Sequence, residues 1–289
     1  MIGIKFWLNR WADLLVYLSI IFLFYAIVHL YWKDVANDRK QTELIRILSI
    51  DKWIWDFWKS KVIFVIPAYN ESDHTLDIIQ EVLDVWYWVV FVDDWSSNDL
   101  YAKVVNKFDG KDVLAIKHLN NLWQWAALQT GFSAILQEPN KCEYVVTFDS
   151  DGQHCLKDLK NFLDAFKKDP KLDIVLWSRF LGSAVNMPIS KKIVLKIWII
   201  FTSFFSWLRL TDTHNWYRVI KLSSLPKIKI TMNWMAHASE ILDIISREKL
   251  KYAEVPNTIL YTDYSMARGQ KLSNSLKIVK NLIFDKFFS

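Results

Sequence analysis

The stretch VVFVDDWSSNDL, residues 89–100, combines a buried strand with a sharp acidic turn. Its apolar run leads into Asp93 and Asp94, and the Ser, Asn and Asp residues that follow are typical turn formers. Trp95 stands at the apex, where a tight turn usually takes glycine because only glycine accepts a positive φ without steric cost. The stretch therefore predicts a strand whose carboxyl end carries acidic side chains, with an unexplained tryptophan beside them.

The composition of the chain sharpens that question. The 289 residues include 16 tryptophans and only 6 glycines, whereas average usage would give roughly 20 glycines. The hydrophobic fraction of 52% is ordinary for a membrane-associated enzyme, and the net charge of +5 suits an anionic membrane surface or phosphate-bearing substrates. The positive charge is too diffuse to indicate nucleic acid as a partner. Two cysteines make no disulfide framework, which indicates a reducing compartment.

A membrane helix is predicted for residues 14–32, which contain no Asp, Glu, Lys or Arg. As a helix this segment would span roughly 28 Å, close to the ~30 Å hydrocarbon core of a bilayer. A buried helix of a soluble domain is the alternative, but such a helix usually carries a polar stripe. The basic residues that flank the segment slightly favour a cytoplasmic carboxyl-terminal side. We therefore expect an anchor in the inner membrane of the cell, with the remaining chain on the cytoplasmic side.

Strands and helices alternate after a polar linker that we place at about residues 33–60. The strands are apolar on both faces, as in a parallel sheet covered by helices, so we predict an α/β fold with a mostly parallel central sheet. The predicted strands are 61–69, 89–94, 113–118, 143–151 and 173–179, and the predicted helices are 73–85, 127–137 and 156–168. The predicted organisation is an anchor with its linker at 1–60, an α/β domain at 61–271 and an amphipathic helix at 272–289.

Two of the predicted strands end in acidic clusters. Asp93 and Asp94 end one strand, and the segment FDSDGQH places Asp149 and Asp151 at the end of another. Ligands of open α/β sheets bind at the carboxyl ends of strands, and paired carboxylates there suit Mg²⁺ or Mn²⁺ shared with substrate phosphates. The chain contains neither a G-x-G-x-x-G fingerprint nor a G-x-x-x-x-G-K-[ST] loop, which argues against a dehydrogenase and an ordinary NTPase.

Several motifs, taken in order, resemble those of the family 2 glycosyltransferases, which have the GT-A fold. They are VIPAYNE at 65–71, VDDWSSND at 92–99, NLWQWAALQTGF at 121–132, FDSDGQH at 148–154, WSRF at 177–180, DTHNWYR at 212–218 and YSMARGQK at 264–271. The resemblance spans residues 62–271 and is closest to the polyprenyl-phosphate sugar transferases of the dolichyl-phosphate mannose synthase type. It implies an inverting transferase that moves a hexose from a nucleotide sugar to a polyprenyl phosphate.

The resemblance also implies a site for the nucleotide-sugar donor and for a divalent cation, Mg²⁺ or Mn²⁺. Carboxylates at the end of the second strand can accept hydrogen bonds from a base or a ribose, and a cation neutralises the diphosphate as it leaves. The residues expected to contact the donor are Pro67, Tyr69, Glu71, Asp93, Asp94, Asp149, Arg179, Arg268 and Lys271. The residues expected to bind the metal are Asp149, Asp151 and Gln153.

Asp212 and Arg218 are the expected catalytic residues. Arg218, like Arg179, suits phosphate oxygens because a guanidinium group binds them bidentately. A sugar hydroxyl as acceptor would need Asp212 as a base, whereas a polyprenyl phosphate is already an anion and needs only positioning. In the second case Asp212 would orient Arg218 or the donor sugar. Arg268 and Lys271 would close over the diphosphate.

The same resemblance accounts for the tryptophans. Glycine stands in the family motifs, or would be equally natural, at the positions of Trp95, Trp123, Trp125, Trp177, Trp207, Trp216 and Trp234. A large side chain at such a position costs roughly 1–3 kcal/mol, and several of them would consume a typical folding stability of about 5–15 kcal/mol. We hypothesise that one codon, UGA, means glycine in the source's genetic code and was translated here as tryptophan. Real tryptophans would instead favour a non-catalytic, membrane-bound homologue.

Two further apolar segments bear on the acceptor. Residues 193–210 and 272–289 are apolar but carry basic residues, which is typical of helices that lie on a membrane surface. Core-packed helices are the alternative. Together with the predicted anchor, these segments favour an acceptor in the lipid bilayer, such as a polyprenyl phosphate used in cell envelope biosynthesis. A transferase of the same fold that acts on a glycan or on another lipid remains the alternative.

Overall fold

The computed structural model of the chain contains two compact units, residues 1–45 and 46–289. The residues that the structure describes are 2–50, 60–137, 142–185, 192–193, 195–196, 199–200, 202–203, 208–212, 216–230 and 237–260. The predictions for Arg268, Lys271 and the helix at 272–289 lie outside the described residues.

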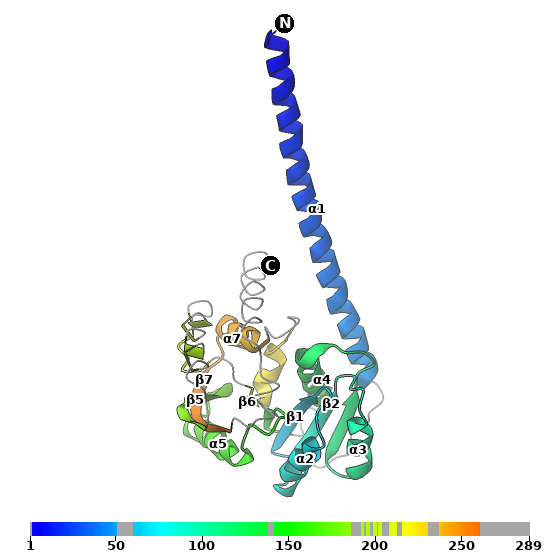
Figure 1. Ribbon diagram of the computed structural model, residues 1–289. Coiled ribbons are helices and arrows are strands. Elements are labelled where there is room, and N and C mark those ends of the chain that lie inside the picture. The colour runs from blue at the N-terminus through cyan, green and yellow to red at the C-terminus, as the bar shows by residue number, and fades with distance from the viewer. Residues whose placement is uncertain are drawn as a thin grey trace. The chain divides into compact units, whose positions relative to one another are not determined.

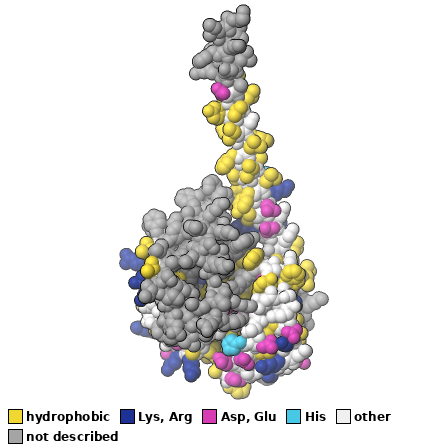
Figure 2. All heavy atoms as spheres, in the orientation of Figure 1, with side chains coloured by type: hydrophobic (Ala, Val, Ile, Leu, Met, Phe, Trp, Pro, Cys, Tyr) yellow, Lys and Arg dark blue, Asp and Glu magenta, His cyan; other side chains and the backbone are white. Residues whose placement is uncertain are grey.

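One long helix, α1 (Ile2–Ile50), makes up the described part of the N-terminal unit and extends five residues beyond it. The predicted membrane helix at 14–32 lies within α1, and the helix continues through residues 33–50, where we expected a linker. Large apolar side chains along it are exposed, among them Leu15 and Phe22, and Figure 2 shows hydrophobic side chains along its described part. Within the described residues, Asp13–Leu48 is the one helical segment that is long and apolar enough to cross a membrane.

The second unit centres on a seven-stranded sheet in the order β3-β2-β1-β4-β6-β5-β7 (Figure 1). Its strands are β1 (Val62–Ala68), β2 (Trp88–Asp93), β3 (Val113–Lys117), β4 (Tyr144–Thr147), β5 (Ile174–Val185), β6 (Arg218–Lys221) and β7 (Tyr252–Leu260). All described pairings are parallel except those of β6, which runs antiparallel to both of its neighbours. The mostly parallel α/β sheet is confirmed, and β6 and β7 are strands that the sequence analysis did not identify.

The helices of this unit connect the strands. They are α2 (His74–Asp84), α3 (Leu100–Lys107), α4 (Trp123–Gln137), η1 (Leu156–Asp158), α5 (Leu159–Lys168), η2 (Leu222–Lys227) and α7 (His237–Arg247). The three predicted helices are present as α2, α4 and the pair of η1 with α5. Helix α4 begins at Trp123, one turn before the predicted start, so the last three residues of the motif NLWQW are already helical.

Helices pack on both faces of the sheet. Phe64 and Ile66 of β1 share one hydrophobic core with residues of α2, α3 and α5. Val65 points to the opposite face, because side chains alternate along a strand. On that face α4 approaches so closely that a β-carbon added to Gly131 would overlap the Val65 side chain. Packing therefore requires glycine at position 131, and α4 is held directly against β1.

Three tryptophans have the left-handed backbone conformation that favours glycine. Their φ angles are 63° at Trp86, 63° at Trp95 and 72° at Trp123. In the described part of the chain, only Asn70 and Lys249 are further non-glycine residues with this conformation. It costs an L-residue about 1–2 kcal/mol. The backbone at Trp95 and Trp123 thus agrees with the hypothesis that glycine belongs there, and Trp86 joins them.

Trp86 ends α2 at the position that glycine most often takes. Its N–H donates to the Leu83 carbonyl at 2.9 Å, and the Tyr87 N–H donates to the Val82 carbonyl at 3.3 Å. These two bonds make a Schellman motif, whose left-handed residue is usually glycine. Because Trp86 is 88% exposed, its side chain gains no burial that would offset the backbone strain. No motif of the family covers Trp86, so the sequence alone did not mark this position.

Trp125 and Trp177 are unfavourable for a different reason. Both are buried, and neither indole N–H has a hydrogen-bond partner among the described residues. A buried indole N–H usually finds an acceptor, because leaving it unpaired costs free energy. Of the other suspect positions, Trp216 is half-buried, and Trp207 and Trp234 lie outside the described residues.

The backbone geometry predicts that Trp86→Gly and Trp95→Gly each raise the free energy of unfolding by about 1 kcal/mol, because glycine removes the left-handed strain. Chemical denaturation of the full-length chain in detergent measures the effect. Lys249→Gly, at the matching position after α7, should stabilise by a similar amount. Trp88→Gly, in the regular and buried backbone of β2, should destabilise by roughly 3 kcal/mol or more.

The codons of the gene test the same hypothesis independently. The gene should carry UGA at positions 86, 95, 123, 125 and 177. Ordinary UGG codons among them, or a loss of stability in Trp86→Gly and Trp95→Gly, would show that the tryptophans are native.

Candidate active site

The carboxyl ends of parallel strands meet at one edge of the sheet. The Asp94 N–H donates to the Ala68 carbonyl at 2.8 Å, which joins the segment after β2 to the end of β1. The His118 N–H donates to the Asp93 carbonyl at 2.9 Å, which joins the segment after β3 to β2. The loop after β4 begins at the same edge, because β4 pairs in parallel with β1. We call this region the acidic edge, for its residues Asp93, Asp94, Asp149 and Asp151.

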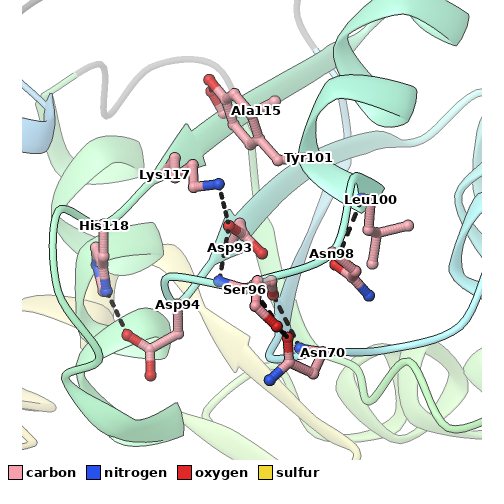
Figure 3. Close-up of polar contacts among 11 residues, drawn as sticks. Asn70, Asp93, Asp94, Ser96, Asn98, Leu100, Tyr101, Ala115, Lys117 and His118 are labelled. Atoms are coloured by element: carbon pink, nitrogen blue, oxygen red, sulfur yellow. Dashed lines mark hydrogen bonds and ion pairs between the residues drawn. The ribbon is translucent and has the colours of Figure 1, made fainter.

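Asp93 and Asp94 are buried, and each has one carboxylate oxygen without a partner among the described residues. The second oxygen of Asp93 lies 3.5 Å from Lys117 Nζ (Figure 3). The second oxygen of Asp94 interacts with His118 Nδ1 and accepts the Leu122 N–H, both at 2.8 Å. The unpartnered atoms, Asp93 Oδ1 and Asp94 Oδ2, are acceptors that N–H or O–H groups of a ligand would satisfy.

The loops after β1 and β2 are tied together through Asn70. Its side-chain oxygen accepts the Ser97 N–H at 2.8 Å and the Ser97 hydroxyl at 3.0 Å. Its backbone N–H donates to the Ser96 hydroxyl oxygen at 2.9 Å, and the Asn98 amide donates to the Glu71 carbonyl at 2.8 Å. Figure 3 shows Asn70 beside Ser96 at this junction. These bonds hold Tyr69 and Glu71, two of the predicted donor contacts, next to the end of β2.

Asp149 and Asp151 lie in the loop after β4 and disfavour each other's charge. Burial, and then the carboxylates of Asp151 and Glu71, raise the pKa of Asp149 well above its usual value. Burial and Glu71 also raise the pKa of Asp151, against the Gln153 N–H that donates to Asp151 Oδ1 at 2.9 Å. A nearby cation would favour the ionised forms of both carboxylates. This loop therefore suits a positively charged ligand.

The carboxylates of this loop fit Mg²⁺ or Mn²⁺ that is bound jointly with a substrate. Among the described residues, no three His, Cys, Asp or Glu side chains converge into a metal site of their own. Mg²⁺ commonly uses one or two carboxylates and completes its shell with water and substrate phosphates. Asp149 and Asp151 match that pattern, while Gln153 is seen to hold Asp151 through its backbone.

Asp212 forms a buried ion pair with Arg179. Its Oδ2 atom accepts the Arg179 Nε–H at 2.6 Å and the Arg179 backbone N–H at 3.1 Å. Glu254 of β7 accepts the N–H groups of Thr211, at 2.8 Å, and of Asp212, at 3.2 Å. The carboxylate of Glu254 thus fixes the backbone that carries Asp212, and Asp212 fixes the guanidinium of Arg179. The sequence had suggested Arg218 or the donor sugar as the group that Asp212 orients, and the structure gives Arg179.

Arg218 is fully buried at the start of β6, paired with Thr147 of β4 and Leu176 of β5. Its guanidinium nitrogens have no hydrogen-bond partner among the described residues, and burial lowers its pKa to about 9. A buried cation without a counter-ion is costly. Arg218 would therefore be stabilised by an anionic ligand, and its role as a phosphate clamp stays a prediction.

The structure also identifies residues that the sequence analysis missed. Asn70, His118 and Glu254 each hold a predicted site residue or its loop. His118 ends the predicted strand VLAIKH, so the rule that parallel strands end at one edge could have found it. Glu254 lies in β7, which had no recognisable sequence signal. Pro67 lies in β1, paired with Val92 of β2, while Arg268 and Lys271 lie outside the described residues.

Known proteins share this sequence pattern and this fold. The model of the family named Glycosyl transferase family 2 matches residues 63–228. A UDP-N-acetylglucosamine–dolichyl-phosphate N-acetylglucosaminyltransferase of Methanococcus voltae is 28% identical over 244 residues, which cover 78% of this chain and 96% of that protein. An uncharacterized protein of Methanocaldococcus jannaschii is 28% identical over 235 residues, 80% of this chain and 94% of that protein.

A solved structure with the same fold is glucosyl-3-phosphoglycerate synthase from Mycobacterium tuberculosis, in complex with Mn²⁺, UDP and glucosyl-3-phosphoglycerate. The TM-score is 0.55 at 12% sequence identity, over 80% of this chain and 84% of that chain. At this identity the likeness concerns the fold alone, and it confirms the predicted GT-A architecture.

The acidic edge predicts opposite effects of Asp149→Asn without and with metal. Folding raises the pKa of Asp149. At a pH above the usual pKa of an aspartate, the ionised Asp149 side chain therefore destabilises the metal-free fold. The metal-free variant should therefore melt about 2–4 °C higher at pH 7, whereas Mn²⁺ should raise the melting temperature of the parent only. Asp164→Asn, which loses an exposed pair with Lys167, should keep the Mn²⁺ response. An equal Mn²⁺ shift in Asp149→Asn would exclude this metal site.

Loss of the Asp212 carboxylate should be severe for stability. Asp212→Ala leaves the Arg179 guanidinium buried without its carboxylate, which costs about 3–5 kcal/mol in comparable pairs. Asp243→Ala, which breaks a surface pair with Arg247 at 3.9 Å, should cost less than about 1 kcal/mol. Urea denaturation of both variants measures the difference. Similar losses in the two variants would contradict the structural role of the Asp212–Arg179 pair.

Proposed function

The chain belongs to glycosyl transferase family 2, and from that premise we propose that it transfers a hexose or an N-acetylhexosamine from a nucleotide sugar to a polyprenyl phosphate. The acidic edge carries this proposal. It offers two unpartnered, buried acceptor oxygens, on Asp93 and Asp94, beside a carboxylate pair whose raised pKa values call for a cation. A nucleotide sugar with its divalent cation supplies groups for both.

The nucleoside part of the donor binds at the ends of β1 and β2. Asp93 Oδ1 and Asp94 Oδ2 accept hydrogen bonds from the base or from the ribose hydroxyls. Tyr69 is 48% exposed and held at this junction by the Asn70 network, so its ring is available to the base. Pro67 and Glu71 complete the nucleotide site.

The diphosphate part of the donor lies toward the loop after β4. Mg²⁺ or Mn²⁺, when bound by Asp149, Asp151 and Gln153, supplies charge neutralisation of the leaving diphosphate. Arg179 and Arg218 bind phosphate oxygens of the substrates. Arg179 is oriented in advance by Asp212, and the unpaired guanidinium of Arg218 gains its missing counter-ion. Arg268 and Lys271 close over the diphosphate.

The reaction exchanges one bond at the anomeric carbon. A phosphate oxygen of the acceptor forms a bond to the anomeric carbon. The bond between that carbon and the donor diphosphate breaks, and its electron pair leaves with the nucleoside diphosphate. Attack from the face opposite the leaving group inverts the anomeric centre. Because the acceptor oxygen is already anionic, no base has to remove a proton. Asp212 therefore contributes by positioning Arg179, and the enzyme acts through orientation and charge neutralisation.

A lipid acceptor is supported by features outside the acidic edge. The relative from Methanococcus voltae, of which this chain spans 96%, is named for transfer to dolichyl phosphate. Helix α1 contains an exposed apolar segment of membrane-spanning length. In the partly described stretch 193–210, Ile193 and Ile200 are 55% and 72% exposed, which suits a helix lying on a bilayer. Nucleotide sugars are cytosolic, so the transferase unit faces the cytoplasm from the inner membrane.

Transfer is tested with the full-length chain and with a glycine parent, the same chain with Trp→Gly at positions 86, 95, 123, 125, 177, 207, 216 and 234. Each is incubated in liposomes with a polyprenyl phosphate, Mn²⁺ and radiolabelled UDP-N-acetylglucosamine or another nucleotide sugar. The glycine parent should produce a labelled lipid that mild acid cleaves, because a glycosyl phosphate is acid-labile. Removal of residues 1–32 should weaken co-sedimentation with liposomes but leave slow transfer in detergent.

The acceptor class is decided by competing substrates. Efficient transfer to a soluble saccharide or to a phosphate-free lipid, with none to any polyprenyl phosphate, would establish a different acceptor for the same fold. Absence of donor hydrolysis and of transfer in both forms of the chain would favour a non-catalytic homologue.

A further inference from the structure

We propose that His118 is a positioning residue for the donor nucleotide, because it fixes the carboxylate of Asp94 and leaves one oxygen of that carboxylate for the ligand. The inference rests on the proposed function, which places a nucleotide at the acidic edge. It adds a residue that lies outside the motifs of the sequence analysis and that touches no substrate itself.

His118 joins two elements of the fold through its two ring nitrogens. Nδ1 lies 2.8 Å from Asp94 Oδ1, and Nε2 lies 2.8 Å from the hydroxyl oxygen of Thr130 in α4. The side chains of His118 and Asp94 are 0% and 2% exposed. Figure 3 shows the His118 ring directed at the Asp94 carboxylate. The ring is therefore held from both sides in a water-excluded position.

The chemistry of the partners assigns the proton on the ring. An ionised carboxylate can only accept, so Nδ1 of His118 carries the hydrogen that is donated to Asp94. In the neutral ring Nε2 is then the acceptor, and it takes the hydroxyl hydrogen of Thr130. Asp94 thus fixes the tautomer, and the Thr130 hydroxyl, which can donate or accept, donates to the remaining ring nitrogen and holds the ring in place.

The orientation of Asp94 follows from these contacts. Oδ1 receives His118 Nδ1–H and the Leu122 N–H, whereas Oδ2 has no partner among the described residues although it is buried. Rotation of the carboxylate would break both hydrogen bonds, which share one charged acceptor atom. Thr130 is next to Gly131, which packs on Val65 of β1, so the support comes from rigid elements. Asp94 Oδ2 is thereby presented to the nucleotide at a fixed place.

Nucleotide binding tests the inference directly. Isothermal titration calorimetry with UDP and with GDP, in the presence of Mn²⁺, identifies the nucleotide that the full-length glycine parent binds more tightly. His118→Ala should raise the Kd for that nucleotide about 10-fold or more, and KM for the donor should rise far more than kcat falls. Thr130→Val, which removes one hydroxyl, should raise the Kd by roughly 3-fold. His118→Asn, whose amide can donate from near the Nδ1 position, should recover most of the affinity.

A double-mutant cycle separates positioning from general damage to the fold. If His118 acts through Asp94, then His118→Ala should change the Kd by less than about 2-fold in an Asp94→Ala background. Ser224→Ala is the control, because it removes the bond from a buried hydroxyl to the half-buried carboxylate of Asp173, before β5. This control should leave the Kd unchanged. Melting temperatures identify folded variants, and His118→Asn with Thr130→Val keeps the test decisive where His118→Ala does not fold.

Three outcomes overturn the inference. They are an unchanged Kd in folded His118→Ala, additive effects of His118→Ala and Asp94→Ala, and a parent that binds neither nucleotide. The last outcome would remove the proposed function as well. A parent that binds a nucleotide but transfers no sugar to a polyprenyl phosphate would overturn the acceptor alone, and the role of His118 would stand on the binding data.

Discussion

The burial of like charges at one edge of the parallel sheet is the constraint on which the site depends. Parallel strands end side by side, so β1, β2 and β4 bring carboxylates from distant parts of the chain together. Buried carboxylates persist only when hydrogen-bond donors or cations hold them. Lys117, His118 and backbone N–H groups hold Asp93 and Asp94. Asp149 and Asp151 instead have raised pKa values, and a cation bound beside them would stabilise their ionised forms.

One arginine of the candidate site is held in place by carboxylates. Glu254 accepts backbone N–H groups and so fixes Asp212, which in turn fixes Arg179. Arg218 has no such support among the described residues, and burial lowers its pKa. The guanidinium of Arg179 is therefore already oriented by Asp212, whereas that of Arg218 is buried in the sheet without a hydrogen-bond partner among the described residues. This asymmetry is compatible with the proposed function, in which the two arginines would meet different anionic groups.

Backbone conformation sets a second constraint, on the loops that surround the site. Trp95 follows Asp94 directly, and Trp123 follows Leu122, whose N–H reaches Asp94. Both tryptophans have left-handed backbones, which an L-residue adopts only at a cost. The residues beside these tryptophans donate backbone hydrogen bonds to Asp93, Asp94 and Asn70. Glycine at both positions would satisfy the same bonds without strain.

The sequence by itself determined the fold class, the acidic strand ends, the apolar N-terminal helix and the family. Short apolar runs that end in acidic turns predict the strands of a parallel sheet and the residues at its carboxyl edge, because that pattern is local in the sequence. The tertiary structure alone decided which polar groups pair. His118 with Asp94, Arg179 with Asp212 and Glu254 with the Thr211 backbone are contacts across 24, 33 and 43 residues. Such pairs depend on strand order and on the antiparallel insertion of β6, and no local periodicity encodes either.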